Sequence, residues 1–319
     1  MSAFRLRNLA LAAALAAGFT APAMAQRVIR MVVPFGPGAV QDTIARTFNA
    51  ELGQALGATV VVENRPGAGG TVGTAQVAKA TDNNTLVLAA ASHTLAGHLY
   101  SKLAYDPVKD FVGVAYIGNS GYAIAAPGNL GVNNLADYVK LLKSKPGQSN
   151  YASAGNGSAT HMGMAYFLAK AGVEMQHVPM KSTGDAVNEV LAGRVQGVTS
   201  SLIGITGYKA DPRIKILAYT GEKRSKFMPD LPTVAEAGVP GYKFDSWIGV
   251  LAPSTMPKAE AERLNAAINK VMAEPVIQER LNRLGVEAGA MSVDQFQQLL
   301  RADYDAAGIL VKASGARIE

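Results

Sequence analysis

The amino-acid sequence predicts an α/β fold with mostly parallel sheets. Short apolar runs of strand length alternate along the chain with longer stretches in which apolar residues recur at every third or fourth position, which is the pattern of successive β–α units. Hydrophobic residues make up 49% of the 319 residues and charged residues only 17%, a composition typical of a well-packed globular protein. This length suits two domains or one large one.

Residues 1–25 are predicted to be a secretory signal peptide that is not part of the fold. Arg5 and Arg7 supply a positive charge, an apolar run follows at 9–19, and a small-x-small cleavage site (Ala-Met-Ala) ends the segment. The apolar run is too short to span a bilayer as a helix. Mature protein is expected to begin near Gln26 and to be exported, and a periplasmic location is expected.

The charge and cysteine content exclude several function classes. The chain has no cysteine, which excludes disulfides, thiolate chemistry and a lipid anchor on cysteine. The formal net charge is +6, of which two units belong to the signal peptide, so the mature chain carries +4. This excess is spread out without a run of Lys or Arg, so no nucleic-acid binding is expected. A mild positive field favours small anionic ligands.

The mature chain opens with a predicted strand at 28–33, a turn dense in Gly and Pro, and a helix. Apolar residues recur at Ile44, Phe48 and Leu52, and Gly57 is expected to end this helix. The glycines of the turn allow backbone N–H groups to approach a ligand, and the helix N-terminus adds free donors and a positive partial charge. This stretch is either an anion-binding cradle or an ordinary strand–turn–helix corner, and by itself it does not decide between the two.

The remaining elements follow from the same signals. Further strands are predicted at 59–63, 85–91, 111–117, 122–126, 176–179, 195–199, 214–220 and 243–251, with a short strand end at 151–152. Helices are predicted at 69–79, 135–145, 185–192, 257–272 and 275–284, with another that ends at Gly172. Asn133 or Asn134 opens the helix at 135, and Ser292 with Gln295 forms a capping box for the last helix. The chain after 251 is expected to be a purely helical tail.

A second loop rich in glycine and small polar residues, at 153–161, again joins a strand end to a helix start. In open α/β sheets, ligands bind beyond the carboxyl ends of the strands. Two such loops, far apart in the chain, suit two domains that face each other across a cleft and aim N–H groups and hydroxyls at one anion. The candidate ligand-binding residues of the two loops are Phe35, Gly36, Gly38, Ala39, Gln41, Asp42, Gly155, Asn156, Gly157, Ser158, Ala159, Thr160 and His161.

Eight motifs, in order along essentially the whole mature chain, carry a resemblance to a known family. They are VPFxPGxxxDxxAR at 33–46, VENRPGAGG at 62–70, YDPVKDF at 105–111, NYASxGNG at 150–157, HVPxK at 177–181, KRS at 223–225, PTVxEAGxPGY at 232–242 and KASGA at 312–316. With these motifs the chain resembles the Bug/TctC family, the periplasmic solute-binding receptors of tripartite tricarboxylate transporters.

The resemblance implies a two-domain periplasmic binding protein of the type II-like, Venus-flytrap kind. Residues 26–122 plus 249–319 would form one domain and 123–248 the other, joined by a two-strand hinge. The domains would close on a small organic carboxylate held by the two loops through backbone groups, hydroxyls and ordered waters. The partners implied are membrane transporter subunits (TctA/TctB-like), to which a monomeric receptor would deliver its ligand. No cofactor and no metal are expected.

Four departures from the family pattern fall in the expected pocket. Ala39 stands where the family usually has a second glycine, Ala165 replaces a common Glu, and Met180 replaces the usual Tyr. Ser200, followed by Ser201, takes the place of an acidic residue near the end of a strand. Loss of carboxylates removes partners for an ammonium group. We therefore expect a simple carboxylate or dicarboxylate without an amine, with the two serine hydroxyls available to a second polar end.

Several single residues have more than one interpretation. Asp42 is either a helix-start residue or a ligand contact through water, because direct contact would repel a carboxylate. His93, with Ser92, either lines the cleft or makes a structural hydrogen bond. Lys181 either brings positive charge to the cleft or is a solvated surface residue. His161 is expected to cap its own loop, and Trp247 to pack at the core or hinge.

Enzymatic interpretations have little support in the sequence. A dinucleotide fingerprint, a phosphate-binding P-loop and a nucleophile elbow are all missing, and four His without Cys form no convincing metal set. A hydrolase built on Ser158 and His161 has no third group indicated by spacing. Two alternatives to transport remain open: such a periplasmic carboxylester hydrolase, and a sensory binding protein that signals to a membrane kinase.

Overall fold

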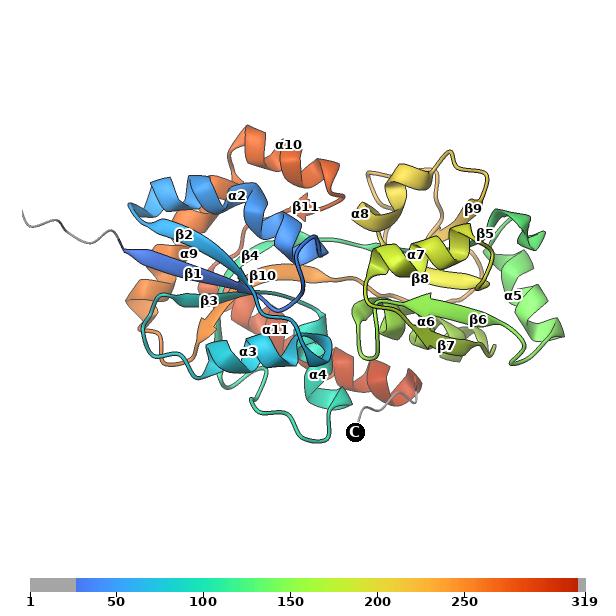
Figure 1. Ribbon diagram of the computed structural model, residues 1–319, viewed down its shortest axis with the longest axis horizontal. Helices are drawn as coiled ribbons and strands as arrows, with labels where there is room; N and C mark the ends of the chain where they lie inside the picture. The colour runs from blue at the N-terminus through green and yellow to red at the C-terminus, as the bar shows by residue number, and fades with distance from the viewer. Residues whose placement is uncertain (1–26, 315–319) are drawn as a thin grey trace, which may run out of the picture.

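The computed structural model describes residues 27–314, which form two α/β lobes side by side, each built on its own sheet (Figure 1). The predicted signal peptide, residues 1–25, lies outside the described residues. Within residues 27–314, no helix combines the length and the apolar character needed to cross a membrane.

The first lobe contains a six-stranded sheet in the order β11-β4-β10-β3-β1-β2. Its strands are β1 (Val28–Val33), β2 (Thr59–Asn64), β3 (Thr85–Ala90), β4 (Phe111–Asn119), β10 (Trp247–Pro253) and β11 (Glu287–Ala288). The second lobe contains a five-stranded sheet in the order β7-β6-β8-β5-β9. Its strands are β5 (Tyr122–Pro127), β6 (Asn150–Ser153), β7 (Gln176–Pro179), β8 (Gly197–Ser201) and β9 (Ile214–Tyr219). Every predicted strand is present.

The sheets are mixed, so the expectation of mostly parallel sheets is wrong. β1, β2 and β3 run parallel to one another, as do β6, β7 and β8. The strands next to the crossings between the lobes, β4, β5, β9 and β10, pair antiparallel with their neighbours. The chain leaves the first lobe along β4 and returns to it along β10, so these two neighbouring strands run in opposite directions.

The two crossings between the lobes lie side by side and form a two-strand hinge. The Ser120 N–H donates to the Ser246 carbonyl oxygen at 2.9 Å, which ties the outgoing crossing to the returning one. One step into the second lobe, the Phe244 N–H of the returning segment donates to the Thr220 carbonyl oxygen at 2.8 Å. The returning segment is held by these single bonds and not by a ladder, so β10 begins at Trp247 and not at 243 as predicted.

Helices cover both faces of each sheet (Figure 1). The first lobe carries α2 (Val40–Leu56), η1 (Ala68–Gly70), α3 (Thr71–Ala78), α4 (Ser92–Leu99), α9 (Lys258–Met272), α10 (Pro275–Arg283) and α11 (Val293–Ser314). The second lobe carries η2 (Gly128–Leu130), α5 (Leu135–Ser144), α6 (Ala159–Ala171), α7 (Thr183–Leu191), α8 (Leu202–Ile205) and η3 (Thr206–Tyr208).

The helix ends that were predicted from local signals are confirmed. Gly57 ends α2 in the left-handed conformation, at φ 61°. The Asn134 side chain accepts the Asp137 N–H at the start of α5. The Ser292 hydroxyl accepts the Gln295 N–H at 3.2 Å, and the Gln295 side chain accepts the Ser292 N–H at 2.9 Å, which completes the capping box of α11.

Several short elements were not predicted, among them β11, α4 and α8, and the expectation of a purely helical tail is wrong. β11 lies in that tail and is set by its antiparallel pairing of Glu287 with Asn119 of β4. α4 has no clear helical period and is stabilised by burial of Leu95 and Leu99 against the second lobe. α8 has only four residues and follows directly after β8. All three depend on tertiary contacts that a local pattern does not contain.

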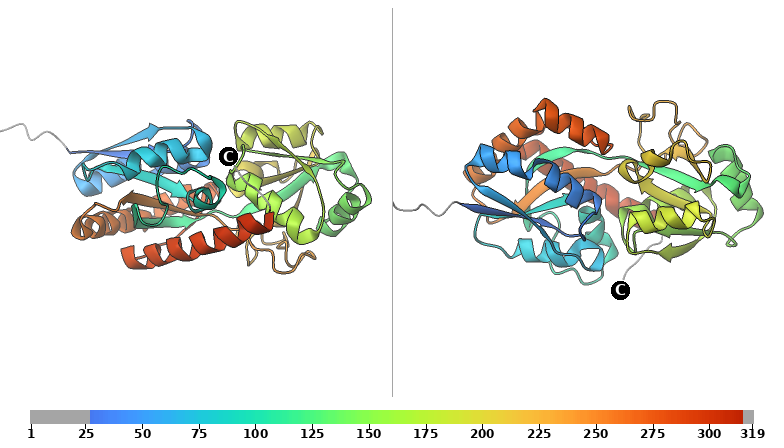
Figure 2. Two further views of the ribbon diagram at one scale, coloured as in Figure 1. Left: turned by 90° about the horizontal axis from the view of Figure 1, so that it is seen from below. Right: turned by 45° about the horizontal axis from the view of Figure 1, so that its top comes forward.

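α11 links the lobes in addition to the hinge. Its first half packs on the first sheet through Phe296 and Leu300, in a cluster with Trp247. Its second half places Ala307 and Val311 in the core of the second lobe. Figure 2 shows the helix running from one lobe along to the other. Trp247 is buried in this cluster and its Nε1–H donates to Asp303 Oδ2 at 2.8 Å, which confirms the predicted packing role.

Candidate ligand-binding site

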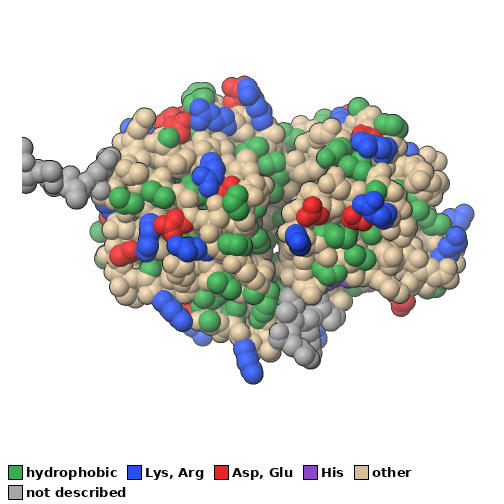
Figure 3. Space-filling model, viewed as in Figure 1, with side chains coloured by type: hydrophobic (Ala, Val, Ile, Leu, Met, Phe, Trp, Pro, Cys, Tyr) green, Lys and Arg blue, Asp and Glu red, His purple; other side chains and the backbone are tan. Residues whose placement is uncertain are grey.

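The carboxyl ends of the parallel strands of both lobes meet at the gap between the lobes. β1, β2 and β3 lead into the loop before α2, into η1 and into α4, whereas β6, β7 and β8 lead into the loop before α6, into α7 and into α8 (Figure 1). A narrow crevice separates the lobes on the molecular surface (Figure 3). The two lobes approach closely across the crevice. A β-carbon placed on Gly69 of the first lobe would lie 3.6 Å from the Asn156 carbonyl oxygen of the second. Both predicted loops therefore border one crevice.

The loop before α2 uses some of its amides internally. The Gly38 N–H donates to Asp42 Oδ2 at 2.9 Å, and the Ala39 N–H donates to the Gly36 carbonyl at 3.1 Å. The N-cap residue Ala39 makes no side-chain cap bond. Within the described chain, the N–H groups of the first turn of α2, at 40–42, find no acceptor. The donors left for an anion are therefore the helix-terminal amides, and not the Gly38 amide that the cradle prediction included.

Asp42 organises this loop from within. Its buried carboxylate accepts from Gly38, from Arg46 at 2.9 Å and from Asn64 at 3.0 Å. Burial alone would raise the pKa of Asp42, but these hydrogen bonds and the Arg46 charge outweigh it and hold the pKa below its ordinary value. Asn64 also donates to the Phe35 carbonyl at 3.0 Å. These contacts favour the helix-start interpretation of Asp42.

The loop before α6 is braced by its own hydroxyls. Ser158 is the N-cap, and its hydroxyl accepts the His161 N–H at 3.2 Å. Thr160 Oγ1 accepts the Ala154 N–H at 2.8 Å, and His161 Nδ1 accepts the Gly157 N–H at 3.1 Å, so the predicted capping role of His161 is confirmed. In the described chain, the N–H groups of Asn156, Ala159 and Thr160 find no acceptor. These three amides are available to a ligand.

A stack of aromatic rings supports this loop, and it was missed from the sequence. The His161 and His177 rings lie 4.0 Å apart and 9° from parallel, and Tyr151 stacks on His177 at 4.9 Å. The parallel register of β6 and β7 pairs Tyr151 with His177, which places the rings on one face. His177 Nε2 lies 2.6 Å from Ser153 Oγ. Only the strand register brings these residues together, so no motif spacing could have revealed the stack.

Both histidines of the stack are neutral at neutral pH. Burial, together with the neighbouring His177, lowers the pKa of His161 to about 4. Burial also lowers the pKa of His177 to about 4. Neutral His161 can accept the Gly157 amide, whereas its protonated form has no lone pair at Nδ1 for this bond. The shape of the loop is therefore tied to the neutral ring.

We expect the pH dependence of stability to reflect this stack. The folded pKa values lie below the ordinary value of 6.5, so the stabilisation is present above pH 6.5 and is lost as the pH falls through about 4. His161→Gln should show a smaller drop in melting temperature between pH 7 and pH 5 than the wild type. His93 contributes in the same direction in both proteins, so the quantity to compare is the difference between their drops in melting temperature. Equal drops would contradict a role for His161.

His93 makes a structural hydrogen bond. Its Nε2–H donates to the Pro107 carbonyl at 2.8 Å, and its ring stacks on Tyr105 and meets the edge of Phe111. Burial lowers its pKa to about 4, although the Pro107 bond acts the other way. With Ser92 it also lines a cavity of about 10 Å³ behind Gly69 and Gly70, which is room for a single water. The structural interpretation of His93 is the better supported one.

The remaining candidates lie at the ends of β7 and β8. Lys181 is solvent-exposed beyond the end of β7. Ser200 and Ser201 are buried at the end of β8, where the Ser200 hydroxyl donates to the Ser201 carbonyl at 3.1 Å. The Ser201 hydroxyl is buried and finds no partner in the described chain. A buried hydroxyl without a partner, at a strand end beside the crevice, is suited to a ligand or an ordered water.

Comparison with known proteins settles the family. A sequence profile described as "Tripartite tricarboxylate transporter family receptor" (TctC) matches residues 44–316. The chain belongs to the TctC family. Members of this family are periplasmic solute-binding receptors and not enzymes. In this TctC-family chain the Ser158 hydroxyl accepts the His161 backbone N–H, as the N-cap of α6.

Three solved structures resemble this TctC-family chain. The periplasmic binding protein BugD is 31% identical, with a TM-score of 0.84 over 92% of this chain and 99% of BugD. Rpa4515 of R. palustris, solved with adipate, is 29% identical, with a TM-score of 0.85 over 92% and 100%. MatC of Rhodopseudomonas palustris, solved with bound malate, is 29% identical, with a TM-score of 0.82 over 89% and 99%.

Proposed function

We propose that this protein captures a small organic carboxylate in the crevice between its lobes, in the periplasm, and delivers it to TctA/TctB-like membrane subunits. The ligand is a dicarboxylate, and the receptor acts as a monomer. The lobes that close on the ligand are 26–122 plus 249–319, and 123–248. The observation that carries this proposal is the pair of loops that lead into α2 and α6 and border the same crevice. Within residues 27–314, the amides at 40–42 on one side and those of Asn156, Ala159 and Thr160 on the other find no acceptor.

The free amides are numerous enough to hold one carboxylate. A micromolar affinity requires about 8 kcal/mol. A helix terminus contributes only about 1 kcal/mol, so charge-assisted hydrogen bonds of roughly 1.5–3 kcal/mol each must supply most of the binding free energy. Amides at 40–42 on one side and at Asn156, Ala159 and Thr160 on the other are the donors. Because the donors belong to different lobes, the ligand favours the closed state in which they converge.

The second polar end of the ligand is assigned to the end of β8. The Ser201 hydroxyl is buried there beside Ser200, and it has no partner among residues 27–314. Neither these serines nor Ala39, Ala165 and Met180 bring a carboxylate to the site, so an ammonium group would have no ion partner among them. Two related proteins were solved with adipate and with malate, both dicarboxylates. These observations support a dicarboxylate over an amino acid.

A thermal-shift panel on the mature protein tests this proposal. The panel contains C3 to C8 dicarboxylates, tricarboxylates, aromatic acids and acidic amino acids at millimolar concentration, with calorimetry on each hit. A ligand that binds only the folded state stabilises it by RT ln(1 + [L]/Kd), so a micromolar binder should shift the melting temperature clearly. We expect a dicarboxylate to give the largest shift. A larger shift with an acidic amino acid would contradict the ligand class, and no shift with any acid would contradict the site.

A further inference from the structure

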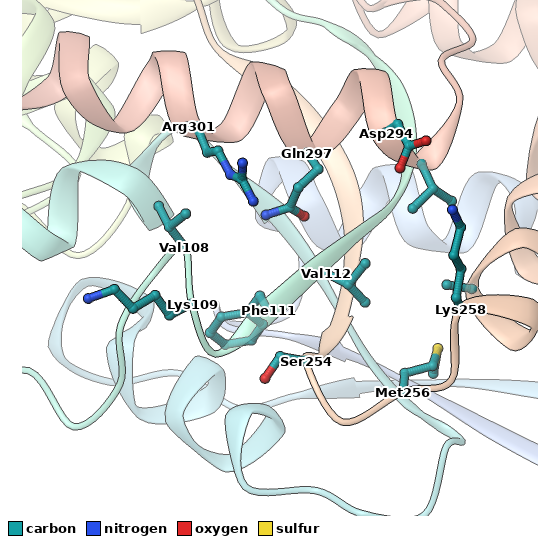
Figure 4. A pocket seen from close by; sticks show the side chains of 12 residues that line it. Val108, Lys109, Phe111, Val112, Ser254, Met256, Lys258, Asp294, Gln297 and Arg301 are labelled. Atoms are coloured by element: carbon teal, nitrogen blue, oxygen red, sulfur yellow. The ribbon is translucent and has the colours of Figure 1, made fainter.

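A second pocket lies on the first lobe, away from the crevice. It has a volume of about 660 Å³ and lies between the start of β4, the turn before α9 and the first turns of α11 (Figure 4). None of its lining residues belongs to the second lobe or to the loops that border the crevice. Along β4, its residue Phe111 pairs with Pro253, whereas the hinge lies beyond Asn119, about 26 Å away at strand spacing. The pocket is therefore separate from the proposed carboxylate site.

The floor of this pocket is apolar and fixed in place. Phe111, Met256 and Val293 line it and are at most 8% exposed, and each belongs to a core cluster of the lobe. On α11, Val293, Gln297 and Arg301 are four residues apart and share one face of the helix. Gln297 Oε1 accepts the Gly113 N–H of β4 at 2.8 Å, which holds this face of α11 against the sheet. The floor therefore exists before any ligand arrives.

The rim of the pocket is positively charged. Lys109, Lys258 and Arg301 line it together with a single acid, Asp294, which leaves a net charge of +2. In the described part of the chain, Lys109 pairs with Asp106 at 3.3 Å and Lys258 with Glu262 at 3.7 Å; both pairs are solvent-exposed, and such pairs are weak. The Arg301 guanidinium has neither an ion pair nor a hydrogen bond within residues 27–314, and it extends over the pocket beside Gln297 (Figure 4).

We propose that this pocket binds an amphipathic organic anion, with a carboxylate on Arg301 and an aliphatic or aromatic tail on the apolar floor. A guanidinium binds a carboxylate through two parallel hydrogen bonds, and the lysines at the rim add to its field. The volume lies in the range of small-molecule sites. This chemistry differs from that of the crevice, where backbone amides and hydroxyls suit a ligand that is polar at both ends. The two sites therefore select different acids.

Fluorescence of 1-anilinonaphthalene-8-sulfonate, a sulfonate with an apolar ring system, tests this site in the mature protein. We expect enhanced emission at neutral pH from the fully folded protein, and displacement by decanoate but not by malate. Arg301→Gln should weaken binding about tenfold or more, because a charge-assisted bidentate contact is lost. Met256→Glu should abolish it by placing a charge on the floor. Circular dichroism establishes that the variants are folded.

Two control variants make the result decisive. Arg283→Gln removes an exposed arginine that pairs with Glu279 on α10, and it should leave the fluorescence unchanged. Gly157→Val alters the crevice and should also leave it unchanged. Loss of the signal in Gly157→Val alone would assign the probe to the crevice and overturn the proposal, as would equal binding by Arg301→Gln and the wild type, or no binding at all. None of these outcomes depends on whether the crevice binds a dicarboxylate.

Discussion

Gly157→Val is expected to lower the affinity for the carboxylate ligand by about a hundredfold or more. Gly157 has φ 73°, a conformation that a β-branched residue rarely adopts, so the loop must rearrange. Its rearrangement displaces the free amide of Asn156 and those at the start of α6. The loss of two charge-assisted hydrogen bonds, at roughly 1.5–3 kcal/mol each, accounts for the effect. Calorimetry with the best dicarboxylate of the panel measures it.

Gly131→Val is the matched control for this variant. Gly131 lies in the same lobe at φ 78° and has open space around it, so valine meets the same backbone strain there without touching the crevice. We expect both variants to lose a similar, small amount of stability, and only Gly157→Val to lose the ligand. Unchanged affinity in Gly157→Val, or an equal loss of affinity in both variants, would contradict the assignment of the loop before α6 to the site.

Asp303→Leu is expected to lower the free energy of unfolding by about 2 kcal/mol or more, because it leaves the buried indole N–H of Trp247 without an acceptor. Asp303 joins α11 to β10 through Trp247 and to α4 through the Thr94 hydroxyl. Asp303→Asn keeps an oxygen acceptor of the same shape and should cost much less. Urea denaturation of both variants measures the difference. Equal costs would show that the hydrogen bonds contribute little.

The buried Asp303 carboxyl group should also make the stability of the protein depend on pH. Burial raises the pKa of Asp303 above its ordinary value, although the Thr94 and Trp247 bonds act in the opposite direction. The stabilisation linked to the protonated acid is therefore present below the ordinary pKa and is lost as the pH rises through the raised pKa. As the pH rises from the ordinary pKa of Asp to the raised pKa of Asp303, the free energy of unfolding of the wild type should fall relative to that of Asp303→Asn, whose amide does not titrate. A constant difference between the two proteins would contradict the raised pKa.

Local signals in the sequence predicted the elements that depend on few contacts. Gly57, Asn134 and the pair Ser292 and Gln295 act within one helical turn, and all end or begin their helices as predicted. The antiparallel strands at the hinge and the two-residue strand β11 depend on partners far along the chain. The direction of the hinge strands is set by the crossings between the lobes, and β11 exists because it pairs with β4. Apolar periodicity encodes neither contact.

The candidate site likewise combines features that local sequence signals predict with features that depend on distant contacts. Both glycine-rich loops were predicted from a strand, a turn and a helix start in sequence, and both border the crevice. The internal use of the Gly38 amide was missed, because it depends on how the Asp42 carboxylate is turned by Asn64 and Arg46. The support of the second loop by His177 was missed because His177 reaches His161 only through the register of β6 and β7.

The most direct test of the central claim is the distance between the lobes with and without ligand. The chain has no cysteine, so Gln76→Cys on α3 and Asn188→Cys on α7, both exposed, place one spin label on each lobe without competing thiols. Double electron–electron resonance then gives the distance distribution between the labels. Addition of a saturating dicarboxylate is predicted to shift and narrow this distribution, because one ligand must join amides of both lobes. An unchanged distribution with a ligand that calorimetry shows to be bound would contradict capture between the lobes.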